Sequence, residues 1–171
     1  MGAYRVHLDH LFGGSALAAV DGDGRVRLPR FVREVAGRRS DDRTLVLGLH
    51  ESDPCLTGYD RPYRRVVHAD AERMRLREEA PEAGSAAPHH RRARRAFGLT
   101  EEAGYGDDGR IMLPPMVRRI GRIEGLALFV GTGGAFEIWN PHLAADSGDP
   151  ALAELARWRL GHDLPRTQEE E

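Results

Sequence analysis

Lysine is absent from this sequence of 171 residues, and cysteine occurs only once, at Cys55. All 25 basic residues are therefore arginines, so any contact with a phosphate or a base must use a planar, bidentate guanidinium group. A single cysteine excludes an intrachain disulfide, and no cysteine-based zinc site is expected. The sequence also lacks a run of the roughly 18 apolar residues that a membrane-spanning helix requires. These absences favour a reducing cytoplasm.

Long apolar runs are scarce at the start of the chain as well. The mildly apolar segment LFGGSALAAV, residues 11–20, is preceded by Asp9 and His10 and contains two adjacent glycines. Those features are a poor match to a secretory signal peptide. We therefore expect this segment to form a strand.

What the sequence does contain is a repeat. DGDGRVRLPRFVREVAG, residues 21–37, returns 85 positions later as GDDGRIMLPPMVRRIGR, residues 106–122, with seven of seventeen positions identical. The identical pairs are Asp23/Asp108, Gly24/Gly109, Arg25/Arg110, Leu28/Leu113, Pro29/Pro114, Val32/Val117 and Arg33/Arg118. A period of this length is too long for a solenoid unit and indicates a duplicated small domain.

Each copy predicts the same order of elements: strand, turn, strand, short helix, hairpin. In residues 25–28, a period of two places Arg25 and Arg27 on one face and Val26 and Leu28 on the other. Pro29 and Pro114 then suit the first turn of a helix, and Gly37 and Gly121 its end. Hairpins are expected from strands at 44–49 and 55–59, and at 126–131 and 135–139.

The rest of the chain predicts helices, separated by a loop. An exposed helix is expected over residues 66–80, a loop over 81–88, a strongly basic helix over 89–98, and a terminal helix over 151–161 before an acidic tail, RTQEEE. Net charge is +5 over residues 61–122 and −6 over residues 123–171. Four arginines of the basic helix, at positions 91, 92, 94 and 95, favour a solvated surface facing acidic tails of neighbouring subunits over a DNA contact.

The duplicated motifs resemble the MraZ family of bacterial transcription regulators. The resemblance rests on DGDGR at 21–25, RVRLP, GRIMLPPMVR, LALFVG, and FEIW followed by Asn140. Phe12-Gly13-Gly14 also matches an F-x-G opening that precedes the first motif aspartate by nine residues. The likeness runs from about Phe12 to Leu143, so residues 1–11 are expected to be an extension.

The resemblance implies a β-rich α+β fold. It would consist of duplicated AbrB-like swapped-hairpin β-barrel units that form an intrachain pseudo-dimer with connecting helices. The expected division is an extension at 1–11, a first repeat at 12–60, a helical connection at 61–98, a second repeat at 99–143, and a helix with an acidic tail at 144–171.

The resemblance also implies a function. It predicts a sequence-specific, cytoplasmic and nucleoid-associated repressor that acts on the division and cell-wall gene cluster, including its own promoter. The expected partners are double-stranded DNA with direct repeats and further copies of the chain in a ring-like homo-oligomer; no cofactor, membrane or small-molecule substrate is expected. The expected DNA-binding residues are Arg25, Arg110, Arg27, Asp21, Gly24 and Gly109.

Two positions depart from the family pattern. The second copy has Gly106 where the motif aspartate, Asp21, stands in the first. Both copies also have an acid, Asp23 or Asp108, where the family often has a base before the Gly-Arg pair. A carboxylate there repels phosphate, unless it caps the turn and orients the neighbouring arginine through hydrogen bonds.

Signs of an enzyme or of a metal site are weak. GGSAL lacks the second glycine of a nucleophile elbow, and GTGG at 131–134 reads as a hairpin turn. Cys55 is expected to be a buried core thiol. Neither His7 with His10 nor His89 with His90 has nearby cysteines or carboxylates at ligand spacing, so no catalytic residue and no metal ligand is assigned.

Two other functions remain open. An interaction protein of the same fold that has lost strong DNA binding is favoured by the acidic turns. An antitoxin-like partner of a toxin would use the same fold, but it would typically carry one repeat and a longer disordered tail. Binding to promoter DNA discriminates the first alternative from a repressor.

Overall fold

The computed structural model describes residues 8–78 and 87–164. Its strands are β1 (Ser15–Ala19), β2 (Arg25–Arg27), β3 (Thr44–Leu49), β4 (Leu56–Asp60), β5 (Thr100–Gly104), β6 (Arg110–Met112), β7 (Leu126–Gly131) and β8 (Phe136–Trp139). Its helices are α1 (Arg30–Arg39), α2 (Arg64–Glu78), α3 (Ala87–Ala93), α4 (Pro115–Ile120), α5 (Pro141–Ala145) and α6 (Pro150–His162). Residues 1–7 of the expected extension, most of the expected 81–88 loop and the RTQEEE tail lie outside the described residues.

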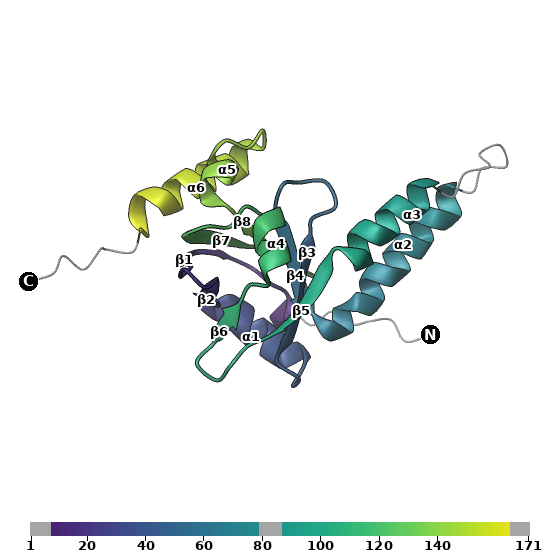
Figure 1. Ribbon diagram of the computed structural model, residues 1–171, viewed down its shortest axis with the longest axis horizontal. Helices are drawn as coiled ribbons and strands as arrows, with labels where there is room; N and C mark the ends of the chain where they lie inside the picture. Colours follow the sequence, from purple (N-terminus) through teal and green to yellow (C-terminus); the bar gives the residue numbers. More distant parts are fainter. Residues whose placement is uncertain (1–7, 79–86, 165–171) are drawn as a thin grey trace, which may run out of the picture.

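The strands form one six-stranded antiparallel sheet, in the order β1-β7-β8-β4-β3-β5, and a separate two-stranded ribbon, β2-β6. Every named pairing is antiparallel. Helices combined with an antiparallel sheet are confirmed, and the arrangement is compatible with the expected β-rich α+β class. The helices lie around the sheet, with the α2–α3 pair leaning out on one side and α5–α6 on the other (Figure 1).

The two copies of the repeat exchange strands. β1 of the first copy pairs with β7 of the second, and β5 of the second pairs with β3 of the first. The hairpins themselves meet through β4 and β8, and the short strands meet through β2 and β6. Each contact thus joins one copy to the other in a reciprocal way, so neither copy completes its sheet alone.

A single core serves both copies. The main cluster of buried side chains contains Val26, Leu28 and Val32 together with their counterparts Ile111, Leu113 and Val117, each at most 2% exposed. The period-two alternation of the short strands and the apolar stripe of the short helices both point into this cluster. Phe12 is also part of it and meets Phe136 edge to face at 5.1 Å.

The helices begin where the prolines predict and end partly elsewhere. Pro29 and Pro114 precede the first residues of α1 and α4, and Gly121 follows the last residue of α4. The expectation that Gly37 ends the first helix is wrong, because α1 continues to Arg39. Arg39 donates to the backbone oxygen of His10 and pairs with buried Asp60, which stabilises the extra turn.

The connecting helices are found close to their predicted places. α2 has no buried residue, in accord with an exposed helix, and a π-helical turn at Arg94–Gly98 follows α3 and ends at the predicted glycine. α5 was not predicted; its first residue, Pro141, follows Asn140, whose side chain accepts from the backbone N–H groups of His142 and Leu143. No helix among residues 8–78 and 87–164 has the length and hydropathy to cross a bilayer.

Candidate nucleic-acid interface

The β2–β6 ribbon presents arginine side chains on one face and apolar side chains on the other. Val26 pairs with Ile111, and both point into the core, whereas the flanking residues of each strand are exposed. Arg27 lies opposite Arg110, and Arg25 lies opposite Met112. All three arginines expected to contact DNA are therefore brought together on the outer face of one short ribbon.

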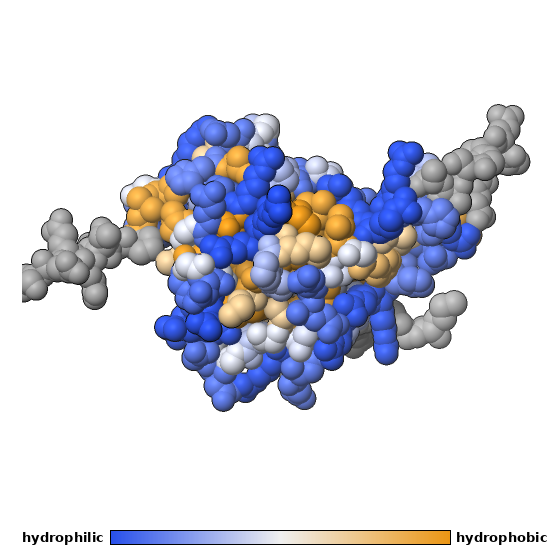
Figure 2. Space-filling view, in the orientation of Figure 1, coloured by the Kyte–Doolittle hydropathy of each residue, from blue (hydrophilic) through white to orange (hydrophobic). Residues whose placement is uncertain are grey.

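Figure 2 shows mainly hydrophilic side chains over the end of the molecule where the ribbon and α1 lie. The side chains of Arg25 and Arg110 are 52% and 67% exposed. Like charges directly opposite one another on a sheet are unfavourable by a fraction of a kcal/mol, so the Arg27–Arg110 pair does not serve the stability of the ribbon. A two-stranded antiparallel ribbon has the width to enter the major groove of B-DNA, where a guanidinium group recognises guanine.

The turn before Arg25 is organised by Asp21. Its Oδ1 accepts from the backbone N–H groups of Asp23 and Arg25, at 2.9 Å each. The hydrogen bond from Arg25 N–H is the main reason why the pKa of Asp21 lies below its ordinary value, although partial desolvation opposes it. Gly24 completes the turn with a φ of 87°, a conformation that costs glycine little.

The second copy builds the same turn with another residue. Asp108 Oδ1 accepts from Arg110 N–H at 3.0 Å, and Gly109 has a φ of 75°. The aspartate missing at Gly106 is thus replaced by one two positions later. Asp107 instead forms an ion pair with Arg43.

The acids before the Gly-Arg pairs also reach the arginines. Asp23 lies 3.5 Å from an Nη of Arg25, and Asp108 lies 3.8 Å from Nε of Arg110. These pairs are exposed and weak, worth about 0–1 kcal/mol. They hold each guanidinium group beside its own turn and lower the positive potential of the ribbon face.

Two arginines that were not predicted to belong to the site, Arg33 and Arg118, contact the two turns and support them. Arg118 donates to the oxygen of Gly22 at 3.3 Å, and its side chain packs close to Gly24. Its counterpart Arg33 lies against Gly109 so closely that a Cβ there would meet Arg33 Cδ at 2.5 Å. Each arginine therefore crosses to the turn of the other copy. The identity of Arg33 and Arg118 in the repeat was the available sequence signal for this role.

The backbone adds a reciprocal pair of bonds. Leu28 N–H donates to Gly109 O, and Leu113 N–H donates to Gly24 O, each at 2.9 Å. Gly24 and Gly109 thus position the ribbon rather than offer a side chain to a ligand. All six residues expected in the site lie in or next to the ribbon: Asp21, Gly24, Arg25, Arg27, Gly109 and Arg110.

The basic helix lies elsewhere. Arg92 forms a two-pronged ion pair with Glu78 of α2, and Arg95 Nε donates to the oxygen of His50. α3 packs against α2 in a separate helical pair, on the opposite side of the sheet from α5–α6 (Figure 1). Two arginines of the basic segment therefore bind partners within the chain.

Fold and site together define a class: a protein of helices and antiparallel sheet, in which two similar sequence segments pair their strands and present an arginine ribbon. No family model matches the chain. It is 28% identical over 156 residues to a transcriptional regulator MraZ of Coxiella burnetii, covering 91% of this chain and 95% of that protein. A Syntrophobacter fumaroxidans protein of the same name is 29% identical, covering 75% and 79%, and one from Legionella pneumophila is 25% identical, covering 85% and 90%. These similarities extend over most of each chain and support membership of the MraZ family.

Proposed function

We propose that this chain is a non-enzymatic, DNA-binding transcriptional regulator and that the β2–β6 ribbon is its DNA-contacting surface. The observation that carries the proposal is the grouping of Arg25, Arg27 and Arg110 on the exposed face of a ribbon anchored by Val26 and Ile111. The relatives named above are transcriptional regulators by name, which supports the same role here.

The finer assignment follows from the same pattern. We take the two copies as AbrB-like swapped-hairpin repeats in an intrachain pseudo-dimer, and the reciprocal pairing of β1 with β7 and of β5 with β3 supports this. Such a unit places one arginine turn from each copy side by side. The proposed action is repression, in the nucleoid, of a division and cell-wall gene cluster that includes the chain's own gene.

A ring-like homo-oligomer that recognises direct repeats completes the proposal. The formal net charge of −2 and the two acid–arginine pairs leave one chain with few free positive charges for DNA. Linking several ribbons in one assembly raises the affinity through effective concentration, without new contacts in each subunit. We therefore expect one copy to bind DNA weakly and an assembly to bind it well.

The test is a titration of the full chain with DNA from upstream of its own operon and with scrambled DNA, at several salt concentrations. Arg25→Ala and Arg110→Ala should each weaken binding and lower the slope of log K against log salt by about 1 per lost phosphate contact. Arg73→Ala, an equally exposed arginine on α2, is the matched control and should bind like wild type. If the ribbon variants also match wild type, the ribbon is not the DNA surface.

One alternative has a specific observation in its favour. Because Asp23 and Asp108 both neutralise ribbon arginines, the chain fits an interaction protein of the same fold that binds DNA weakly or not at all. In that case wild type would not distinguish operon DNA from scrambled DNA at any salt concentration. That result would replace the regulator proposal with the interaction protein.

A further inference from the structure

Three side chains of metal-binding type converge where the β3–β4 connection meets β8. His50 and Cys55 flank the turn of the first hairpin, and Glu137 lies in β8, 82 residues beyond the cysteine. Among the residues that the structure describes, they form the one group of histidine, cysteine and acidic side chains placed to share a metal ion. Sequence spacing could not reveal it, because the pairing of β4 with β8 brings the third member in.

The distances between the ligand atoms suit a tetrahedral ion. Cys55 Sγ lies 3.7 Å from Glu137 Oε2, His50 Nε2 lies 3.5 Å from the same oxygen, and one ligand atom from each residue lies within 4.8 Å of the others. Zinc bonds of about 2.0–2.3 Å place tetrahedral ligands about 3.3–3.6 Å apart. The two distances to Glu137 Oε2 therefore lie in or next to the range that a zinc ion requires.

The backbone holds the three groups in place. His50 N–H donates to Cys55 O at 2.9 Å, and Cys55 N–H donates to Asp53 O at 2.9 Å, so the turn is closed on itself. Trp139 Nε1 donates to the other carboxylate oxygen of Glu137 at 3.4 Å, which leaves Oε2 facing the thiol and the imidazole. A metal site needs this kind of support around its ligands.

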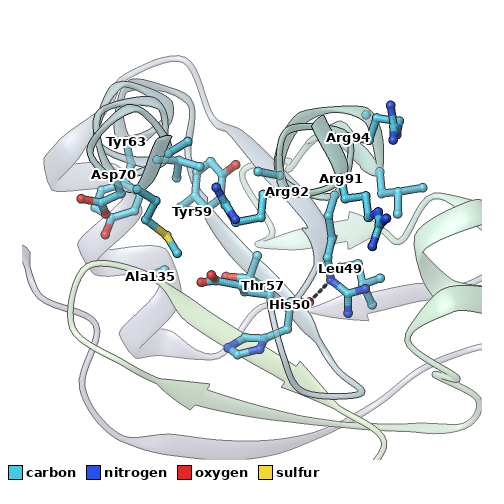
Figure 3. A pocket seen from close by; sticks show the side chains of 18 of the residues that line it. Leu49, His50, Thr57, Tyr59, Tyr63, Asp70, Arg91, Arg92, Arg94 and Ala135 are labelled. Carbon is cyan, nitrogen blue, oxygen red and sulfur yellow. Dashed lines mark hydrogen bonds between the residues drawn. The ribbon is translucent and has the colours of Figure 1, made fainter. Parts of the chain in front are cut away.

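Burial and access also fit. The thiol of Cys55 is fully buried, whereas the side chains of Glu137 and His50 remain 13% and 25% exposed. His50 lines a cavity of about 890 Å³ between the sheet and the α2–α3 pair, and Figure 3 shows its ring at the base of that cavity. The exposed parts of His50 and Glu137 give an ion access to these two ligands, and water can supply a fourth ligand.

Without a metal, two protons point at Glu137 Oε2. Burial, with the nearby carboxylate of Glu137, raises the pKa of the Cys55 thiol far above neutrality, so the sulfur keeps its proton. His50 Nδ1 accepts from the backbone N–H groups of Ser52 and Asp53, so the neutral ring carries its proton on Nε2. The arrangement is a carboxylate that accepts from two neighbouring donors.

We propose that His50, Cys55 and Glu137 form a binding site for a divalent cation of the zinc class. One thiolate, one imidazole and one carboxylate suit Zn²⁺ and its first-row neighbours, whereas Mg²⁺ and Ca²⁺ prefer oxygen alone. On binding, the thiol proton leaves to solvent and the imidazole proton moves from Nε2 to Nδ1, where a small shift would bring the Asp53 carboxylate, now 3.8 Å away, within reach as an acceptor. The exposed N–H groups of Ser52 and Asp53 then turn to water.

The experiment loads the chelator-treated full chain with Co²⁺, which reports sulfur ligation by a thiolate-to-metal absorption band, and separately with Zn²⁺. One equivalent of Co²⁺ should give that band, and binding of Zn²⁺ should release one proton from the thiol. At 100-fold excess over its dissociation constant, Zn²⁺ should raise the melting temperature by about 5–10 °C. Absence of the cobalt band in wild type overturns the proposal.

Variants identify the ligands. Cys55→Ser should abolish the cobalt band, and Glu137→Gln should weaken Zn²⁺ binding at least tenfold while it keeps an acceptor for Trp139. His142→Gln, at an exposed histidine on α5, is the matched control and should bind like wild type. If Cys55→Ser fails to fold by circular dichroism, Glu137→Gln decides alone, and wild-type affinity in that variant refutes the site.

Discussion

Arg27 and Arg110 lie directly opposite each other in the β2–β6 ribbon, so two exposed guanidinium groups occupy neighbouring positions on one face. Their buried neighbours Val26 and Ile111 pair in the same register and fix this arrangement. Folding gains nothing from placing like charges together. The arrangement therefore supports the proposal that the ribbon binds a polyanion.

Stability and binding should therefore separate at this pair. Replacing Arg27 with Gln removes the repulsion, so the free energy of unfolding should stay the same or rise by about 0.2–1 kcal/mol. DNA affinity should fall by about 1–3 kcal/mol if the side chain contacts guanine. Urea unfolding and anisotropy titrations measure the two quantities, and loss of both together would mean that Arg27 is structural.

The acid beside Arg25 should limit DNA binding. Asp23→Asn removes a carboxylate 3.5 Å from that guanidinium group and leaves the turn bonds made by Asp21 intact. We expect tighter binding and a steeper salt dependence, by about 0.9 if one more phosphate contact forms. Asp70→Asn, at an exposed aspartate of α2 that also pairs with an arginine, removes the same charge in the α2–α3 pair, away from the ribbon (Figure 1). Equal gains in both variants would show a general charge effect only.

The turn of the first copy should weaken in acid. The pKa of Asp21 is lowered from its ordinary 3.8, chiefly because Arg25 N–H donates to its carboxylate. A carboxyl group whose pKa falls on folding stabilises the folded state above the unfolded pKa, and that contribution is lost as pH falls through the folded pKa. The stability difference between wild type and Asp21→Asn should therefore be constant near neutral pH and shrink below 3.8. A difference that persists in acid would exclude the charge as its cause.

The sequence predicted the local features of the fold, but it did not predict which strands pair with each other. Alternation in Arg25–Leu28 gave the buried and exposed faces of the ribbon, and the prolines gave the starts of both short helices. The partners of β1 and β5 were not predictable from the repeat, because an antiparallel strand carries no local mark of which hairpin it joins. The predicted end of α1 was too early, because Arg39, its last residue, is held by contacts with His10 and Gly134 that are distant in the sequence.

The candidate site was also predicted where the signal is local, but not where it depends on contacts between the two copies. Duplication marked Arg25 and Arg110, while the roles of Arg33 and Arg118 depend on turns that belong to the opposite copy. Asp108 was expected as a possible cap, and its hydrogen bond to Arg110 N–H agrees with that. The local charge pattern could not predict the ion pair between Arg92 and Glu78, because Glu78 lies 14 residues before Arg92 in the sequence.

The buried pair Arg39–Asp60 should be the most sensitive ionic contact outside the ribbon. Arg39 Nη1 lies 2.8 Å from Asp60 Oδ1, their side chains are 5% and 2% exposed, and the same Nη1 donates to Gly134 O of the second copy. Arg39→Met leaves an unpaired carboxylate in the core, which should cost about 3–5 kcal/mol of unfolding free energy. The melting temperature should fall by about 6–20 °C.

Two further variants show whether the unpaired charge is the cause. Arg38→Met, in the same turn of α1 but exposed, should melt within a few degrees of wild type. Arg39→Met combined with Asp60→Leu removes both charges and should recover part of the loss, although the backbone oxygens of His10 and Gly134 stay without their donor. If the double variant is no more stable than Arg39→Met, the loss of stability comes from the missing backbone contacts of Arg39 and not from the unpaired carboxylate of Asp60.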